Sequence, residues 1–137
     1  AELAVRSLAS GDTMSVAGAA PTLLLFYRSD CPACERAAPA WRDLVRRAGS
    51  GLRTLAVGLE AEASALAWVR AELPRALGVR PVEPDDFLHR LGVRRVPTTV
   101  LVGVGDRLLH RRSGVPAPGD VRRLPVLAGA RGAIPPP

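Results

Sequence analysis

The chain has 137 residues, which is enough for one domain with a substantial core and too few for two. Its apolar content of 47% excludes an intrinsically disordered chain. The net charge is +6 and all 19 basic residues are arginine, but these are scattered, aromatic residues make up only 4%, and no nucleic-acid-binding motif is present. We therefore expect no nucleic-acid partner.

No apolar run in the sequence has the length that a membrane-spanning helix needs. Residues 1–20 lack the charged region, apolar region and cleavage site of a signal peptide. Because the chain begins at Ala1 rather than Met, the sequence permits an exported protein from which a signal peptide or anchor has been removed.

The chain opens with a predicted β-hairpin within residues 1–20. Two strand-like segments, Leu3–Leu8 and Thr13–Val16, flank the turn residues Ser10-Gly11-Asp12. The continuous apolar run Thr22–Tyr27 follows, and it is typical of a strand in the buried middle of a parallel sheet.

The rest of the chain alternates between helical and strand patterns. From Cys34, apolar residues recur at helical spacing and predict an amphipathic helix, kinked at Pro39. The further predicted elements are, in chain order, a strand at Arg53–Leu59, a helix at Ala61–Leu73 with Leu66, Val69 and Leu73 on one stripe, a strand at Ala76–Val82, a helix at Pro84–Leu91, a hairpin of Thr98–Val104 and Arg107–Arg112 around Gly105-Asp106, and a terminal helix at Pro118–Leu127.

This order of elements predicts an α/β fold with a central mixed β-sheet covered by helices on both faces. We expect a single domain over residues 1–128. Pro125 should shorten or bend the terminal helix, and residues 129–137 should form a disordered tail or linker stub.

Cys31 and Cys34 stand directly after the first buried strand, at the start of a helix. Pro32 between them is favoured as the first helical residue, because the N–H that it lacks would have no partner inside the helix. Cys31 is then the N-cap residue, whose side chain accepts a hydrogen bond from the backbone N–H of Cys34. This bond and the positive end of the helix dipole stabilise a thiolate on Cys31. We expect Cys34 to be more buried and suited to resolving a mixed disulfide.

Other interpretations of the two cysteines carry less weight. A structural disulfide across two residues would constrain the unfolded chain by only roughly 2 kcal/mol. A zinc site would need two more ligands, and His89 and His110, the only histidines, stand outside zinc-finger spacing, so we expect no metal. Two unrelated buried cysteines and a metallochaperone role remain as weaker alternatives to redox chemistry.

The sequence resembles the thioredoxin superfamily, and more closely the TlpA-like exported thioredoxins, which include cytochrome c maturation proteins. The resemblance covers the chain from about Leu3 to Leu127. Cys31-Pro32-Ala33-Cys34 matches the redox motif of the family, and Pro39 falls where thioredoxins kink the same helix. Ala61–Val82 resembles the helix and strand that the TlpA-like branch inserts.

The loop Leu91–Thr99 is similar to the family loop that carries a cis-proline, which would be Pro97. The resemblance implies that this loop lies against the dithiol and that Val96 and Pro97, together with Pro32 and Ala33, contact the partner.

The resemblance implies a thioredoxin-like fold and a thiol–disulfide oxidoreductase in which Cys31 attacks and Cys34 resolves. It implies a monomer that needs no cofactor, is located in a bacterial periplasm or on the outer face of a membrane, and reacts with the thiols or disulfides of partner proteins. A redox donor or acceptor protein, membrane-bound or soluble, would complete the cycle. The alternative is a non-catalytic thioredoxin-like binding or structural module.

The chain departs from the family pattern at two positions near the dithiol. Leu25 stands where thioredoxins carry a buried acid, and Ala37 stands where the cytochrome-maturation branch carries Glu. We therefore expect water or a group of the substrate to accept the proton of Cys34.

Three arginines are predicted to meet near the dithiol, namely Arg28, Arg94 and Arg95. They would form a basic rim that favours acidic partner surfaces. The alternative is that they serve only solubility, since this chain uses Arg for every cation.

Overall fold

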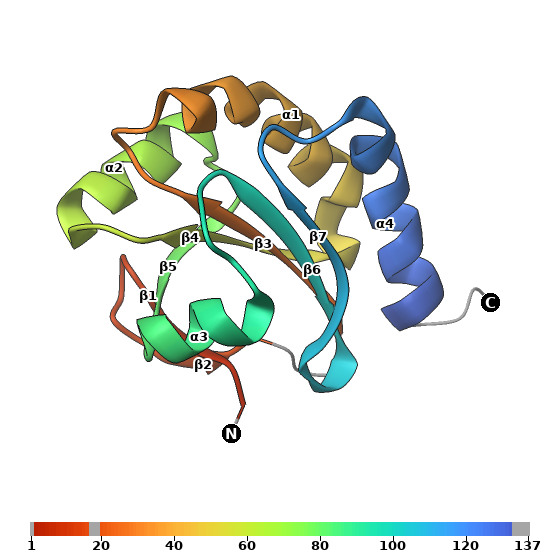
Figure 1. Cartoon of the computed structure of the whole chain (residues 1–137), viewed down its shortest axis with the longest axis horizontal. Coiled ribbons are helices and arrows are strands. Elements are labelled where there is room, and N and C mark those ends of the chain that lie inside the picture. Colours follow the sequence, from red (N-terminus) through yellow and green to blue (C-terminus); the bar gives the residue numbers. More distant parts are fainter. Residues whose placement is uncertain (1, 17–19, 133–137) are drawn as a thin grey trace.

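The structure, a computed structural model, describes residues 2–16 and 20–132 (Figure 1). Its centre is a seven-stranded mixed sheet with the strand order β2-β1-β5-β4-β3-β6-β7. The strands are β1 (Ala4–Ser7), β2 (Thr13–Ser15), β3 (Thr22–Tyr27), β4 (Arg53–Gly58), β5 (Leu77–Pro81), β6 (Thr98–Gly103) and β7 (Arg107–Ser113). The helices are α1 (Pro32–Ala48), α2 (Glu62–Glu72), α3 (Pro84–Leu91) and α4 (Pro118–Gly132).

The three middle strands β5, β4 and β3 run parallel to one another, and the flanking pairs are antiparallel. All six residues of β3 are buried, as its continuous apolar sequence predicts for a central parallel strand. The N-terminal hairpin is present as β1 and β2, and it joins the sheet through β1, which pairs with β5.

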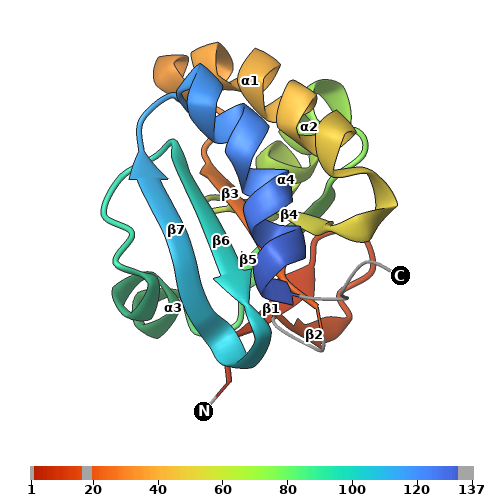
Figure 2. The ribbon, with the colours of Figure 1, turned by 90° about the vertical axis from the view of Figure 1, so that its right-hand side faces the viewer.

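Helices cover both faces of the sheet, as predicted (Figures 1 and 2). Helices α1, α2 and α4 lie on one face, where Trp41 and Leu44 of α1 join Leu124 of α4 in one core. Helix α3 lies on the other face, where Phe87 and Leu91 belong to a second core with the opposite side chains of β3. The α/β fold class is therefore confirmed.

Two of the three residues of the stripe predicted for helix α2 are buried, namely Val69 at 3% and Leu73 at 2% exposure. Leu66 is only half-buried, whereas Trp68 is 8% exposed. The ring of Tyr27 stacks on Trp68 with centroids 4.5 Å apart, and Trp41 meets the same indole edge-on. Because these aromatic contacts bury a large apolar area, they add Trp68 to the buried face of α2 beside Val69.

The C-terminal helix is longer than predicted. Helix α4 continues past Pro125 to Gly132, so residues 129–132 belong to the helix and not to the predicted tail. Leu124 and Ala128, on either side of the proline, are buried in the core beside α1. Their packing outweighs the hydrogen bond that a proline removes from the helix. Residues 133–137 of the predicted tail lie outside the described residues.

The turn between β6 and β7 contains Gly105 and Asp106, as predicted. Both have positive φ angles, 73° and 62°, which is the backbone conformation that favours Gly and Asp in a tight hairpin turn. The Asp106 carboxylate also accepts a hydrogen bond from the backbone of Leu3 at 2.9 Å, which joins this turn to the N-terminal segment. Among the described residues, no helix combines the length and the apolar character needed to cross a bilayer.

Candidate active site

Cys31 is the N-cap residue of α1, as predicted. Its backbone is extended (φ −116°, ψ 106°), and the helix begins with Pro32. The backbone N–H of Cys34 donates a hydrogen bond to the Cys31 sulfur at 3.1 Å. The Cys31 sulfur therefore occupies the position where a helix N-terminus stabilises negative charge.

Cys34 lies in the first turn of α1 and has no exposed surface, whereas Cys31 is half-buried. Both are free thiols in this structure. Burial, reinforced by a hydrogen bond with the Cys31 side chain, raises the pKa of Cys34 from 9.0 to about 12. At neutral pH Cys34 is thus a protonated, protected thiol, and only Cys31 is open to a macromolecular partner.

The loop between α3 and β6 lies against Cys31. The carbonyl oxygen of Val96 is 4.0 Å from the Cys31 sulfur. The Val96–Pro97 peptide bond is cis, the geometry that the family resemblance implies. Two further bonds hold the loop, because the Thr98 hydroxyl donates to the Arg95 carbonyl at 2.6 Å and the Gly114 N–H donates to the Pro97 carbonyl at 2.7 Å.

The residues predicted to contact a partner differ in their exposure. Pro32 is exposed and Ala33 is half-buried at the start of α1. Val96 is half-buried beside the thiol, whereas Pro97 is buried and offers a partner little side-chain surface. The structure therefore brings Val96 to Cys31 directly, whereas it buries the neighbouring Pro97.

The two positions near the dithiol at which the family carries a carboxylate are occupied by Leu25 and Ala37 in this chain. Leu25 and Ala37 are fully buried in the same apolar core as Cys34. Glu35, the acidic residue that directly follows Cys34, is exposed. Asp30 is also exposed and pairs with Arg28 at 3.0 Å, which lowers the pKa of Asp30.

Sequence reasoning missed the contribution of the β4–α2 connection to the site. Glu60 accepts hydrogen bonds from the backbone N–H of Ser29 at 2.7 Å and from its hydroxyl at 2.9 Å. These bonds hold the segment between β3 and α1 that carries the first cysteine. Glu60 follows β4 as Ser29 follows the neighbouring parallel strand β3, and the carboxyl ends of adjacent parallel strands meet at one edge of a sheet. Glu60 could therefore have been predicted from the sequence as a residue that lies near Ser29, because each follows one of two neighbouring parallel strands.

A groove of about 200 Å³, hereafter the basic groove, lies beside Cys31. Its lining residues come from four segments and are Arg28, Leu59, Leu88, Val93, Arg94, Arg95 and Val96. The predicted convergence of the three arginines near the dithiol is therefore confirmed. Leu59, Leu88 and Val93 were not expected at the site.

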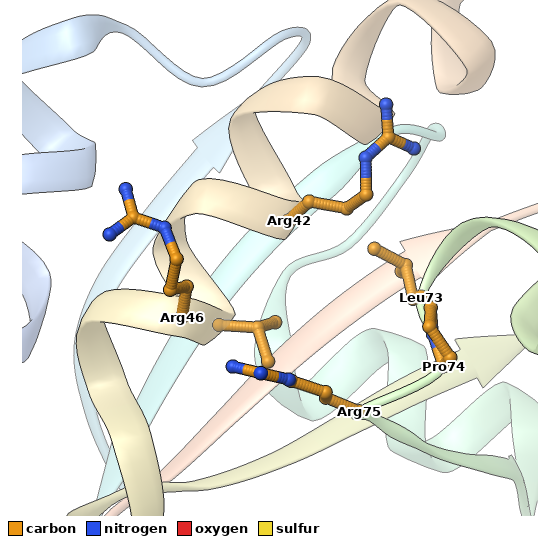
Figure 3. A pocket seen from close by; sticks show the side chains of 6 residues that line it. Arg42, Arg46, Leu73, Pro74 and Arg75 are labelled. Carbon is orange, nitrogen blue, oxygen red and sulfur yellow. The ribbon is translucent and has the colours of Figure 1, made fainter.

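A second hollow, of about 190 Å³, lies between α1 and the end of α2 and contains no cysteine. It is lined by Arg42, Val45, Arg46, Leu73, Pro74 and Arg75 (Figure 3). Among the described residues, no group of three or more His, Cys, Asp or Glu side chains is arranged to hold a metal ion.

Solved structures of several other proteins share this fold. The chain superimposes on the exposed lipoprotein thioredoxin Etrx1 of Streptococcus pneumoniae with a TM-score of 0.73, at 18% identity, over 92% of this chain and 98% of the other. The chain has a thioredoxin-like fold. The same thioredoxin-like fold is found in a secreted Mycobacterium tuberculosis disulfide oxidoreductase homologous to E. coli DsbE (TM-score 0.70, 15% identity, 94% and 96% covered) and in StoA from Bacillus subtilis (TM-score 0.71, 15% identity, 93% and 96% covered). No protein-family model matches the sequence, and a search of curated proteins found no match.

Proposed function

We propose that the protein is a thiol–disulfide oxidoreductase in which Cys31 attacks and Cys34 resolves. The observation that carries this proposal is the pairing of a half-buried Cys31 sulfur, 3.1 Å from the Cys34 N–H at a helix N-terminus, with a fully buried second thiol. A structural pair of cysteines needs no such difference in exposure. The thioredoxin-like fold supports the same chemistry by analogy.

The reaction runs in two exchange steps. The Cys31 thiolate attacks one sulfur of a partner disulfide, forms a mixed disulfide with it, and releases the other partner sulfur as a thiolate that takes up a proton. Cys34 then loses its proton and attacks the Cys31 sulfur, which releases the second partner thiol and leaves a Cys31–Cys34 disulfide. Two electrons have passed to the partner, and a dithiol protein must reduce the new disulfide to restore the enzyme. The reverse sequence oxidises a partner dithiol.

The high pKa of Cys34 sets the order of these steps. A thiol with a pKa of about 12 does not compete with Cys31 for the first attack at neutral pH. Leu25 and Ala37 leave no side-chain carboxylate beside it at the positions the family uses. The proton of Cys34 therefore passes to water or to the departing partner thiolate. Of these two acceptors, the thiolate is the stronger base.

The partner contacts the surface around Cys31, and we assign this contact to Val96 and Pro97 with Pro32 and Ala33. The half-buried Val96 lies 4.0 Å from the thiol through its carbonyl oxygen, and the exposed Pro32 follows Cys31 in the chain. The chain would act as a monomer of the TlpA-like type outside the cytoplasm, a location supported by fold neighbours that are described as secreted and as an exposed lipoprotein.

The test is reduction of insulin disulfides with dithiothreitol as electron source. We expect the wild type to accelerate the reaction and Cys31→Ser to abolish the acceleration. Cys34→Ser is the matched variant, because it keeps the nucleophile and removes only the resolving thiol. After it has been reduced and freed of dithiothreitol, it should accumulate a covalent mixed disulfide with insulin, detected by mass spectrometry under non-reducing conditions.

A wild-type rate equal to that of Cys31→Ser would overturn the proposal and favour a non-catalytic thioredoxin-like module. Equal trapping by Cys34→Ser and Cys31→Ser would remove the distinction between attacking and resolving thiols. A redox titration of the dithiol would then place the direction of the reaction, since such pairs range from about −270 to about −120 mV.

A further inference from the structure

We propose that the basic groove selects partner segments that carry acidic residues next to the reactive cysteine. This inference rests on the proposed function and names the substrate class of the same site. The partner is a polypeptide whose segment lies across Cys31 and continues into the groove.

The position of the groove links it to the thiol. Val96 both lines the groove and places its carbonyl oxygen 4.0 Å from the Cys31 sulfur. Arg28, which also lines the groove, stands three residues before Cys31 in the chain. A peptide whose sulfur meets Cys31 therefore places the residues on one side of that sulfur at the mouth of the groove.

The three arginines of the groove differ in whether they have partners within the chain. Arg28 is held in place, because it pairs with Asp30 at 3.0 Å and donates to the Leu59 carbonyl at 3.1 Å. Arg94 and Arg95 are both exposed, and the described residues offer neither side chain a hydrogen bond or an ion pair. Two guanidinium groups thus remain available to carboxylates of a partner, and Arg binds a carboxylate through two parallel hydrogen bonds.

The floor of the groove is apolar. Leu59 and Leu88 are half-buried, and Val93 is 6% exposed. The volume of about 200 Å³ is below the range of about 300–1,000 Å³ that is typical of pockets enclosing small molecules. A shallow apolar floor beside two unpaired cations suits a peptide that offers an apolar side chain and a neighbouring Asp or Glu.

The second hollow is also lined by arginines, but two of them have acidic partners within the chain. There, Arg42 pairs with Glu72 at 3.5 Å, and Arg46 pairs with Asp43. That hollow contains no thiol (Figure 3). Arg46 and the neighbouring Arg47 lie in the last turn of α1, about 20 Å along the helix from its first residue. They therefore supply a matched control for removing two positive charges.

The experiment measures one exchange step with synthetic peptides. Each peptide carries one cysteine as a mixed disulfide with 2-thiopyridine and one Leu, followed by two Glu, two Gln or two Lys residues. In the full-length Cys34→Ser protein, the Cys31 thiolate attacks the peptide sulfur and forms the Cys31–peptide disulfide. The leaving pyridine-2-thiolate keeps the electron pair of the broken S–S bond and takes up a proton from water to give 2-thiopyridone. Stopped-flow absorbance follows the release and yields a second-order rate constant for each peptide.

We expect the Glu peptide to react about five- to tenfold faster than the Gln peptide at low salt, and the Lys peptide to react more slowly than both. The preference should shrink at 1 M salt, where the Debye length falls to about 3 Å. In Arg94→Gln/Arg95→Gln the ratio of the Glu to the Gln rate should fall to near one, and in Arg46→Gln/Arg47→Gln it should stay near the parent value. Circular dichroism checks that each variant is folded.

Equal rates for the Glu and Gln peptides would overturn the inference while leaving the proposed function standing. An equal loss of preference in both double variants would also overturn it, because only the net charge would then matter. If glutathione disulfide reacted as fast as the Glu peptide with the same dependence on Arg94 and Arg95, the groove would be a site for a small anion and not for a peptide. A failure of the proposed function is distinct, since the wild type would then reduce insulin no faster than Cys31→Ser, whatever the ratio of the peptide rates.

Discussion

The indole N–H of Trp41 donates a hydrogen bond to the hydroxyl of Thr99 at 2.9 Å, and both residues are buried. Trp41 lies in the middle of the helix that carries the two cysteines, and Thr99 lies two residues after Pro97. This single bond therefore joins the two segments that form the candidate site. It also gives a hydrogen-bond partner to the indole N–H, which is the only polar group of the buried Trp41 side chain.

Removing the acceptor of this bond should destabilise the protein. Thr99→Val keeps the size and branching of the side chain but leaves the buried Trp41 N–H without its partner. We expect the free energy of unfolding to fall by about 1–3 kcal/mol. Urea denaturation of both proteins measures the change. In a Trp41→Phe background the same Thr99→Val substitution should cost clearly less, and an equal cost in both backgrounds would show that the bond does not stabilise the fold.

The raised pKa of Cys34 predicts a loss of stability at high pH. Below pH 9 this thiol is protonated in the folded and the unfolded protein, so its ionisation has no effect. Between pH 9 and about 12 the unfolded chain releases the proton while the buried thiol keeps it, so the unfolded state binds fewer protons and is favoured. The free energy of unfolding should therefore fall as the pH rises, by at most about 1.4 kcal/mol per pH unit from this group.

The comparison that isolates this effect is between Cys31→Ser and Cys31→Ser/Cys34→Ala, since neither protein can form the disulfide. Burial also raises the pKa of Tyr27, and this contribution cancels because both proteins retain Tyr27. Urea denaturation from pH 8 to pH 10.5 should show a steeper decline for the single variant. Parallel pH dependences would mean that Cys34 ionises as easily in the folded protein as in the unfolded chain.

Asp120, at the start of α4, should contribute more stability than a comparable surface carboxylate. Its side chain is 1% exposed, and it accepts hydrogen bonds from Arg112 and from Arg123, the latter at 2.7 Å. Burial alone would raise the pKa of Asp120, but the two arginines outweigh it and lower the pKa. We expect Asp120→Asn to reduce the free energy of unfolding by about 1–3 kcal/mol at pH 7.

The matched control is Asp43→Asn, because Asp43 also pairs with two arginines but is 34% exposed. Its loss should cost less than about 1 kcal/mol. Because the pKa of Asp120 is lowered, its stabilisation is present above the ordinary pKa of 3.8 and disappears as the pH falls through the folded value. Urea denaturation at pH 7 and pH 3 should therefore show the deficit of Asp120→Asn shrinking in acid, and equal deficits for the two variants at pH 7 would contradict the role assigned to burial.

The sequence by itself determined the features that depend on neighbours in the chain. The N-cap position of Cys31 could be predicted because Pro32 and the N–H of Cys34 lie within three residues of it. The continuous apolar run of β3 and the turn at Gly105-Asp106 were predictable for the same reason, since period and turn conformation are local properties.

Only the tertiary structure decided the features that depend on contacts between distant segments. The sequence predicted that Arg28 and Arg94 meet near the dithiol, but not that Leu59 and Leu88 form the floor between them, because four separate segments must first pack together. The burial of Trp68 in place of Leu66 follows from rings on β3 and α1, which the pattern of α2 does not contain. Likewise, α4 continues past Pro125 because the apolar area buried against α1 outweighs one lost backbone hydrogen bond, and that balance depends on a surface that only the folded chain supplies.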